Sequence, residues 1–174
     1  MYKYYTCNSI GMRLSVASMV LIHKKPEAVW PLLCNFKLPN RPKWYYRSLP
    51  FPQECKVIGK KGIGAHRKCK TTKCHLNQKI TQWVPPNKLA FVVISDTGGI
   101  LKKVKRLEYT ITLEDNCNGT KMTCSTNLDI DLHPLLAVIR KPFLHFIMRK
   151  LQQFTINGIK ILAETEPPVI AKMI

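Results

Sequence analysis

The arginine at position 67 is the residue of this chain that is best placed to bind a ligand. Ile63, Ala65, Arg67 and Cys69 share one face of a predicted strand at 63–71, and the apolar members of this set indicate that the face is turned inward. A buried guanidinium requires an anionic or carbonyl partner. We therefore interpret Arg67 as the anchor for a ligand carboxylate, phosphate or polar headgroup. Two alternatives stay open: Arg67 reaches the mouth of the fold, or the alternation is out of register by one residue.

Other side chains point to the same interior. Gln78 and Tyr109 sit on otherwise apolar strand faces, where each could give one hydrogen bond to a ligand or satisfy a neighbouring backbone group. Apolar side chains on these faces and on a C-terminal helix line or fill the interior, and core packing is their default role. The set that the sequence predicts for ligand binding is Arg67, Gln78, Phe91, Tyr109, Met122, Phe146 and Phe154.

The sequence shows no recognisable catalytic or metal site. The five histidines include no pair with the spacing of a helical zinc site, and no Cys-x-x-Cys pair occurs. We find no Ser-His-Asp or Cys-His arrangement that the sequence could support, and no glycine-rich phosphate loop. The sequence therefore predicts no catalytic residue, no metal and no cofactor.

The cysteines and the N-terminal segment bear on the compartment. The seven cysteines are odd in number and irregularly spaced, which is not typical of a disulfide framework. We expect most of them to be small buried or half-buried residues in a reducing compartment. The apolar run at 14–22 is too short to span a bilayer, and Lys24-Lys25-Pro26 stands where a signal peptide would have its cleavage site. A cytoplasmic location, with peripheral attachment to a membrane as an option, is expected.

The chain is strongly basic. Its 174 residues include 28 Lys and Arg against 10 Asp and Glu, a formal net charge of +18. This excess attracts an anionic membrane, a nucleic acid or an acidic protein, although it can also be a solubility trait. Basic residues gather near 60–73 and 102–106, but aromatic residues are not interleaved with them as in a nucleic-acid stacking platform. The predicted partners are a hydrophobic or amphipathic small molecule, then an anionic membrane surface or acidic partner, with nucleic acid less favoured.

The hydrophobic pattern predicts a series of strands. Two of them flank Pro85-Pro86, whose rings remove two N–H donors and end the ladder. Before this corner, Gln78 and Ile80 point to one face, whereas Trp83 points to the other. The strands are predicted at 12–23, 53–58, 63–71, 74–84, 88–95, 104–114 and 120–131.

Helical patterns surround these strands. Pro26 begins a short helix after the first strand, and prolines leave room for at most a second short helix near 41–46. Apolar spacing changes to that of a helix from Pro142 onward, with Pro134 starting a separate short turn before it. Gly158 lies inside this long helix, which indicates a bend or a close packing contact.

Together the elements predict an α+β fold. A curved antiparallel sheet of about six to seven strands wraps around a long C-terminal helix, with two short helices after the first strand. A cavity remains between sheet and helix wherever the inward residues do not fill it. We expect an N-terminal arm at 1–11, one domain at 12–166 and a C-terminal tail at 167–174.

Several motifs in this order resemble the START-like, or SRPBCC, superfamily, which includes polyketide cyclases and dehydrases, birch-pollen-allergen-like proteins and lipid-transfer domains. The matching segments are His-Lys-Lys-Pro-Glu-Ala-Val-Trp at 23–30, Gly-Ile-Gly-Ala-His-Arg at 62–67, Ile-Thr-Gln-Trp-Val-Pro-Pro-Asn-Lys-Leu-Ala-Phe at 80–91 and Gly119-Thr120. The likeness covers roughly residues 14–164 and implies a helix-grip fold. Many members carry a Glu where this chain has Gln78, so a carboxylate role at that position does not transfer.

Three functional hypotheses follow. The first is binding, for transport or sensing, of a hydrophobic or amphipathic, lipid-like molecule in a cavity between the sheet and the C-terminal helix. The second is an enzyme of the polyketide cyclase or dehydrase kind, in which Arg67 or Tyr109 polarises a carbonyl. The third is a toxin-like module that binds RNA or the ribosome through the basic surface. The lack of a visible acid–base pair makes the enzyme a weaker alternative than the binding protein.

Overall fold

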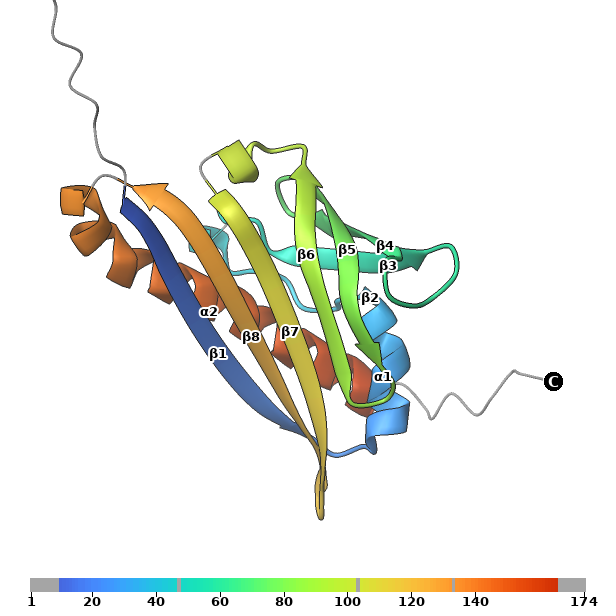
Figure 1. The fold of residues 1–174 in the computed structure, drawn as a ribbon. Helices are drawn as coiled ribbons and strands as arrows, with labels where there is room; N and C mark the ends of the chain where they lie inside the picture. Colours follow the sequence, from blue (N-terminus) through green and yellow to red (C-terminus); the bar gives the residue numbers. More distant parts are fainter. Residues whose placement is uncertain (1–9, 47, 103, 133, 166–174) are drawn as a thin grey trace, which may run out of the picture.

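A single curved antiparallel sheet forms the body of the protein. The computed structural model describes residues 10–46, 48–102, 104–132 and 134–165. The described strands are β1 (Ile10–Ile22), β2 (Asn35–Lys37), β3 (Pro52–Ile58), β4 (His66–Thr71), β5 (His75–Val84), β6 (Lys88–Asp96), β7 (Val104–Asn116) and β8 (Gly119–Leu132). Their order in the sheet is β1-β8-β7-β6-β5-β4-β3-β2 (Figure 1).

Helices cover one side of this sheet. The long helix α2 (Pro134–Thr165) lies across the concave face, and α1 (Pro26–Cys34) closes one end (Figure 1). Two single turns of 3-10 helix, η1 (Trp44–Tyr46) and η2 (Ile100–Lys102), lie in the connections. No helix in the described ranges is long and apolar enough to cross a membrane.

The helix-grip α+β fold is confirmed, with two differences in detail. The sheet has eight strands in the described ranges rather than six or seven, because β2 is only three residues long and cannot show a clear alternation. The second predicted helix is reduced to η1. The predicted arm lies outside the described residues except for Ile10 and Gly11, which belong to β1, and the tail lies outside them entirely.

The prediction that Pro142 begins the long helix is wrong. Helix α2 runs without interruption from Pro134 to Thr165, and Pro142 lies inside it. A proline removes one backbone hydrogen bond from a helix. A helix of 32 residues that packs along a sheet tolerates this loss.

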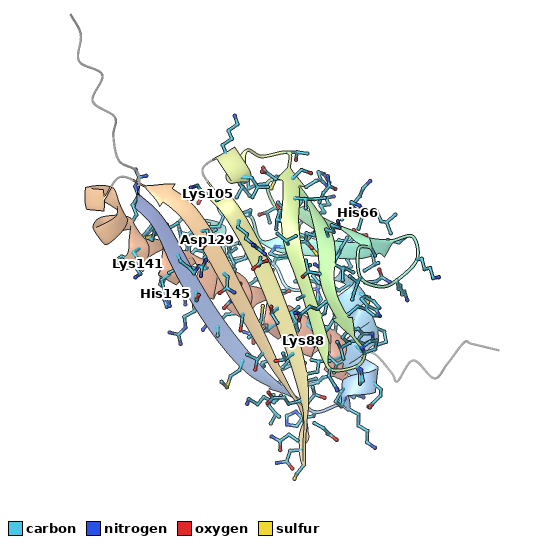
Figure 2. All side chains as sticks on the ribbon, in the orientation of Figure 1. His66, Lys88, Lys105, Asp129, Lys141 and His145 are labelled. Atoms are coloured by element: carbon cyan, nitrogen blue, oxygen red, sulfur yellow. A yellow bond between two sulfur atoms is a disulfide. The ribbon has the colours of Figure 1, made fainter. Side chains whose placement is uncertain are left out.

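The core lies between the concave face and the helices, and the outer face of the sheet is polar. Figure 2 shows polar side chains such as His66 and Asp129 on that outer face. Gly158 allows α2 to approach the loop before η1, since a Cβ there would lie 2.5 Å from Asn40 Oδ1 and 2.9 Å from Leu38 Cδ2. A close packing contact therefore explains this glycine, as the sequence predicted.

A buried glutamine fixes α2 against the sheet. The amide nitrogen of Gln152 donates to the carbonyl of Val16 at 2.9 Å and to Thr126 Oγ1 at 2.6 Å. Its amide oxygen accepts from Ser18 Oγ at 2.9 Å. Gln152 is thus satisfied by two strands at once, which sets how far the helix stands from the sheet.

Candidate ligand cavity

A cavity of about 360 Å³ lies between the concave face of the sheet and α2. This volume is within the range of small-molecule sites in proteins. Most of its lining is apolar, including Phe36, Leu76, Phe91, Val93, Leu101, Leu107, Ile111, Leu144, Ile147, Met148 and Leu151. The polar side chains that reach it include Arg67, Gln78, Tyr109, Arg140, Gln152 and Thr155.

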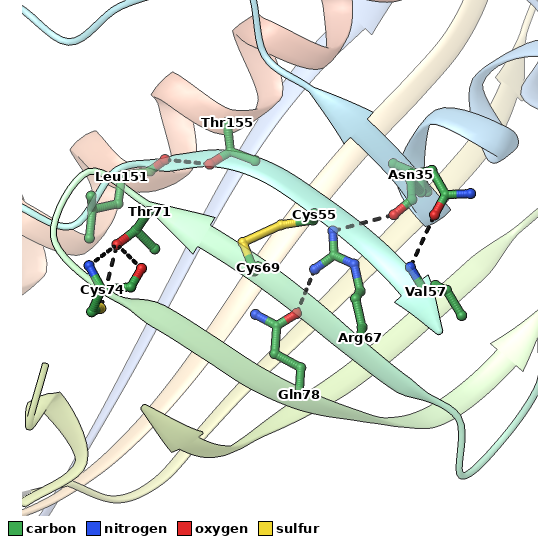
Figure 3. Close-up of a disulfide and its surroundings, with 11 residues drawn as sticks. Asn35, Cys55, Val57, Arg67, Cys69, Thr71, Cys74, Gln78, Leu151 and Thr155 are labelled. Carbon is green, nitrogen blue, oxygen red and sulfur yellow. Dashed lines mark hydrogen bonds between the residues drawn. A yellow bond between two sulfur atoms is a disulfide. The ribbon is translucent and has the colours of Figure 1, made fainter. Parts of the chain in front are cut away.

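Arg67 is buried in the wall of this cavity, with only 3% of its surface exposed. Strand pairing places it opposite Gln78, and its Nη1 donates to Gln78 Oε1 at 2.6 Å (Figure 3). Its Nη2 donates to the Leu33 carbonyl at 3.3 Å, at the C-terminal end of α1, where the helix dipole favours a positive charge. Both open alternatives are excluded, because Arg67 is neither at the mouth nor on the outer face.

The guanidinium of Arg67 has unused hydrogen-bonding capacity. Its Nε is buried and has no hydrogen-bond partner among the described residues. No described carboxylate forms an ion pair with it. The nearest compensation comes from the rings of Phe91 and Phe36, whose centroids lie 4.6 and 5.3 Å from the guanidinium carbon.

Burial lowers the pKa of Arg67 to about 10. The side chain still carries its proton at neutral pH, so a positive charge stands in an apolar wall with no anion from the described residues beside it. A buried charge of this kind is unfavourable unless a partner arrives.

Tyr109 extends the polar part of the wall. It lies directly opposite Phe91 in the β6–β7 ladder, and the two rings stack with centroids 5.3 Å apart. Burial raises the pKa of the Tyr109 phenol, so its hydroxyl is neutral and able to donate. No hydrogen bond of this hydroxyl to a described residue is present, which leaves it available to a ligand.

Four of the seven residues predicted to bind a ligand line the cavity together: Arg67, Gln78, Phe91 and Tyr109. The other three do not. Met122 is fully buried in the core, and Phe154 packs on Phe51 with ring centroids 4.7 Å apart. Phe146 is 49% exposed and lies beneath the Lys150 ammonium, because the cavity side of α2 is the neighbouring stripe that contains Leu144 and Leu151.

Two features of the wall were not predicted. Cys55 and Cys69 face each other across β3 and β4 and form a disulfide that lines the cavity (Figure 3). The sequence predicted that most cysteines are reduced, and this pair is an exception, since the strand register that brings the two together is not visible in the sequence. The second feature is the buried Gln152. Its position between Met148 and Ile156, on the apolar stripe of α2, is the sequence signal that could have indicated a buried polar contact.

The remaining described cysteines are single residues. Cys34, Cys74 and Cys124 are buried, and Cys117 is exposed in the β7–β8 turn. Burial raises the pKa of Cys124 to about 12, so it stays a neutral thiol. No group of three His, Cys, Asp or Glu in the described ranges is arranged to hold a metal ion.

The sequence of the domain matches a known family. A family model described as polyketide cyclase / dehydrase and lipid transport covers residues 13–164. The chain belongs to this family. The resemblance to the START-like superfamily, first seen in the motifs around Pro26 and Pro85-Pro86, is therefore confirmed. A comparison with curated proteins gives no match.

Solved structures share the fold at low sequence identity. A protein of unknown function from Staphylococcus aureus matches with a TM-score of 0.63 and 13% identity, covering 89% of this chain and 96% of the other. Norcoclaurine synthase from Thalictrum flavum, solved in complex with dopamine and hydroxybenzaldehyde, matches with a TM-score of 0.56 and 12% identity, covering 96% of each chain. A major latex-like protein from Panax ginseng matches with a TM-score of 0.58 and 11% identity, covering 89% and 99%. At this identity the likeness establishes the fold alone.

Proposed function

We propose that this protein binds an amphipathic small molecule whose apolar part fills the cavity and whose acceptor head meets Arg67. The observation that carries the proposal is the state of that arginine, which is charged, 3% exposed and left with a buried Nε–H that has no described partner. A carboxylate is the head that fits best, because its two oxygens match the planar donors of a guanidinium. Tyr109 supplies a further neutral donor on the same wall.

Binding is favoured over cyclase or dehydrase chemistry by the nature of the lining. Among the described residues, no carboxylate and no imidazole lines the cavity. These are the side chains that most often act in general acid–base catalysis, within hydrogen-bond reach of the substrate. The enzyme keeps one observation in its favour, because Arg67 and Tyr109 both reach the cavity, and the RNA-binding module stays a prediction.

Displacement of a fluorescent fatty acid tests the proposal. A long-chain carboxylic acid and the primary alcohol of equal chain length compete for the probe, first on the unaltered protein and then on the Arg67→Met variant. A hydrogen bond to a charged group contributes roughly 1.5–3 kcal/mol, so the acid should bind roughly 10- to 150-fold more tightly than the alcohol. The variant should lose this preference while it keeps its affinity for the alcohol.

The Arg140→Met variant is the matched control. Arg140 also reaches the cavity, but its side chain is exposed, so removing the same charge there should leave most of the acid preference in place. An equal preference for acid in the unaltered protein and in Arg67→Met would contradict the role of Arg67. Failure of the probe and of both competitors to bind would contradict the proposed function itself.

A further inference from the structure

An exposed set of aromatic and basic side chains lies beside the cavity, and we refer to it as the aromatic–basic band. Its surface members are Lys43, Trp44, Tyr45, Phe143, Phe146 and Lys150, which are linked beneath the surface by Tyr46, Phe51 and Phe154. Trp44 is 76% exposed and Phe143 is 63% exposed. Large apolar side chains that are this exposed, and that are connected by ring contacts and helical spacing, mark an interaction surface.

The first half of the band is a continuous series of ring contacts. Trp44 meets Tyr45 with centroids 5.7 Å apart, and Tyr45 meets Tyr46 at 4.6 Å. The series continues from Tyr46 to Phe51 at 6.1 Å and from Phe51 to Phe154 on α2 at 4.7 Å. The exposed rings of η1 are therefore anchored to the long helix.

The second half of the band runs along α2. Phe143, Phe146, Lys150 and Phe154 follow one another at intervals of three and four residues, which places them on one side of the helix. The Lys150 ammonium lies 5.4 Å from the centroid of Phe146. In the first half, the Lys43 ammonium stands in the same way 5.8 Å from the centroid of Tyr45.

The band adjoins the cavity. The neighbouring stripe of α2, which includes Leu144, Ile147 and Leu151, lines the cavity. Pro50 and Pro52 also line it, on either side of the Phe51 that joins the two halves of the band. A surface that contacts the band is thus next to the part of the cavity wall that α2 and the segment around Phe51 form.

The two chain segments that carry the band, residues 28–53 and 132–163, are both positively charged. Residues 28–53 contain four Lys and Arg and no acidic residue, and residues 132–163 contain five Lys and Arg and no acidic residue. Figure 2 shows Lys141, one of the five, on α2. We propose that the aromatic–basic band docks the protein on an anionic lipid bilayer, with the rings at the headgroup level and the ammonium groups on lipid phosphates and carboxylates.

A bilayer fits these observations better than other partners. A second copy of this chain would bring a matching positive surface, and the two would repel each other. A nucleic acid would also be attracted by the charge and could stack on the rings, but the bilayer is favoured because the band adjoins an apolar cavity. A protein docked in this way could take up an amphipathic ligand from the bilayer. That uptake rests on the proposed function, whereas the docking itself does not.

Flotation with vesicles of phosphatidylcholine, alone or mixed with phosphatidylserine, tests the proposal on the full chain. We expect binding to the mixed vesicles that weakens as salt is added. Each Lys near an anionic surface contributes about 1 kcal/mol, so Lys43→Gln/Lys150→Gln should weaken binding roughly 30-fold. The control Lys68→Gln/Lys79→Gln removes the same charge from the outer face of the sheet and should bind nearly as well as the unaltered protein.

Tryptophan fluorescence reports the rings directly. Trp30 is buried and Trp83 is partly buried, and their rings contact each other with centroids 5.2 Å apart, whereas Trp44 is 76% exposed. Vesicles of the mixed composition should shift the emission of Trp44 to the blue, and Trp44→Phe should abolish the shift. Phe143→Ser/Phe146→Ser should weaken binding roughly tenfold or more, since each ring loses apolar burial at the interface.

The docking proposal would be overturned if the protein did not bind the mixed vesicles or if both lysine-pair variants weakened binding equally. An unchanged Trp44 emission in the vesicle-bound protein would overturn it as well. Displacement of the bound protein from vesicles by added RNA, together with tighter binding to RNA than to lipid, would also reject the bilayer as the partner. The Arg67→Met variant should float as the unaltered protein does. If it floats but no longer prefers a carboxylate, the docking is upheld independently of how the cavity is used.

Discussion

Replacing the buried polar pair Arg67 and Gln78 by apolar residues should make the ligand-free protein more stable. The change is Arg67→Met/Gln78→Leu, which removes the charge and its hydrogen-bond partner together. Buried ion and polar groups that are replaced by apolar groups of similar volume often leave a protein equally or more stable. If Arg67 is kept for a ligand, the protein without ligand carries the full cost of that charge.

The magnitude follows from the lowered pKa of Arg67. Burial lowers its pKa from the ordinary value of arginine to about 10 in the folded protein, and one unit of pKa equals about 1.4 kcal/mol. The charged form is therefore disfavoured in the folded protein by a free energy on the order of 3 kcal/mol. Because the folded pKa is the lower one, this cost is fully present below about pH 10 and disappears as the pH rises from there toward the ordinary pKa of arginine.

Replacing the pair removes this cost, but it also removes a favourable hydrogen bond. The Leu33 carbonyl loses the hydrogen bond from Nη2, which costs about 1–3 kcal/mol if nothing replaces it. We expect a net stabilisation of up to about 2 kcal/mol, or up to about 8 °C in Tm for a chain of this size. Arg67→Met alone should gain less, because Gln78 Oε1 then stays buried without a donor.

Thermal and urea unfolding of the ligand-free proteins at neutral pH measure this effect. The unaltered protein is first stripped of bound lipid by organic extraction or on a hydrophobic resin. A double variant that is less stable than the unaltered protein by 1 kcal/mol or more would refute the reasoning. Arg67 would then be a structural group that caps α1, and not one held in reserve for a ligand.

Three further predictions concern the scaffold and its pH response. Gly158→Ala should lower the free energy of unfolding in urea by about 1–3 kcal/mol, because the new methyl meets the loop before η1. A gain of about 1 kcal/mol from helix propensity would disprove the contact. The Asn157→Ala variant, at an exposed position on the same helix, is the control. Gln152→Leu should cost about 1–3 kcal/mol in the same assay, since it leaves buried groups on two strands unpaired, and an unchanged midpoint would be inconsistent with its bridging role. The backbone N–H of His23 donates to the Glu164 carboxylate and holds its pKa below the usual 4.5. The stability that this contact adds is therefore present above pH 4.5 and is lost as pH falls through the folded pKa. Glu164→Gln should therefore flatten the acid side of the stability curve, and an identical curve would show that the contact contributes nothing.

Much of the fold was visible in the sequence because long strands and long helices leave clear periods. The strands around Pro85-Pro86 were predicted with nearly their observed ends, and Leu89, Phe91 and Val93 are all buried as the alternation required. The prediction from alternating residues fails where the hydrogen-bond ladder between two strands is irregular. A register shift between Ile80 and Gln82 turns Trp83 toward the interior, against Trp30, although the sequence pattern placed it on the outer face.

The candidate site was predicted only in part for similar physical reasons. Arg67 is buried as predicted, yet Ile63, which supported that inference, is 73% exposed because β4 begins at His66. The period of the strand was correct although its start was not. Phe146 was misplaced because the rotation of α2 about its axis depends on packing against the sheet, which no helical spacing reveals.

A crystal structure of the protein with a long-chain carboxylic acid tests the central claim most directly. We predict that the chain of the ligand fills the cavity and that a carboxylate oxygen lies within hydrogen-bond distance of Arg67 Nε, the buried donor that now lacks a described partner. The account would be contradicted if the carboxylate lay at the mouth beside Arg140 with Arg67 unchanged, or if side chains filled the interior and left the ligand outside.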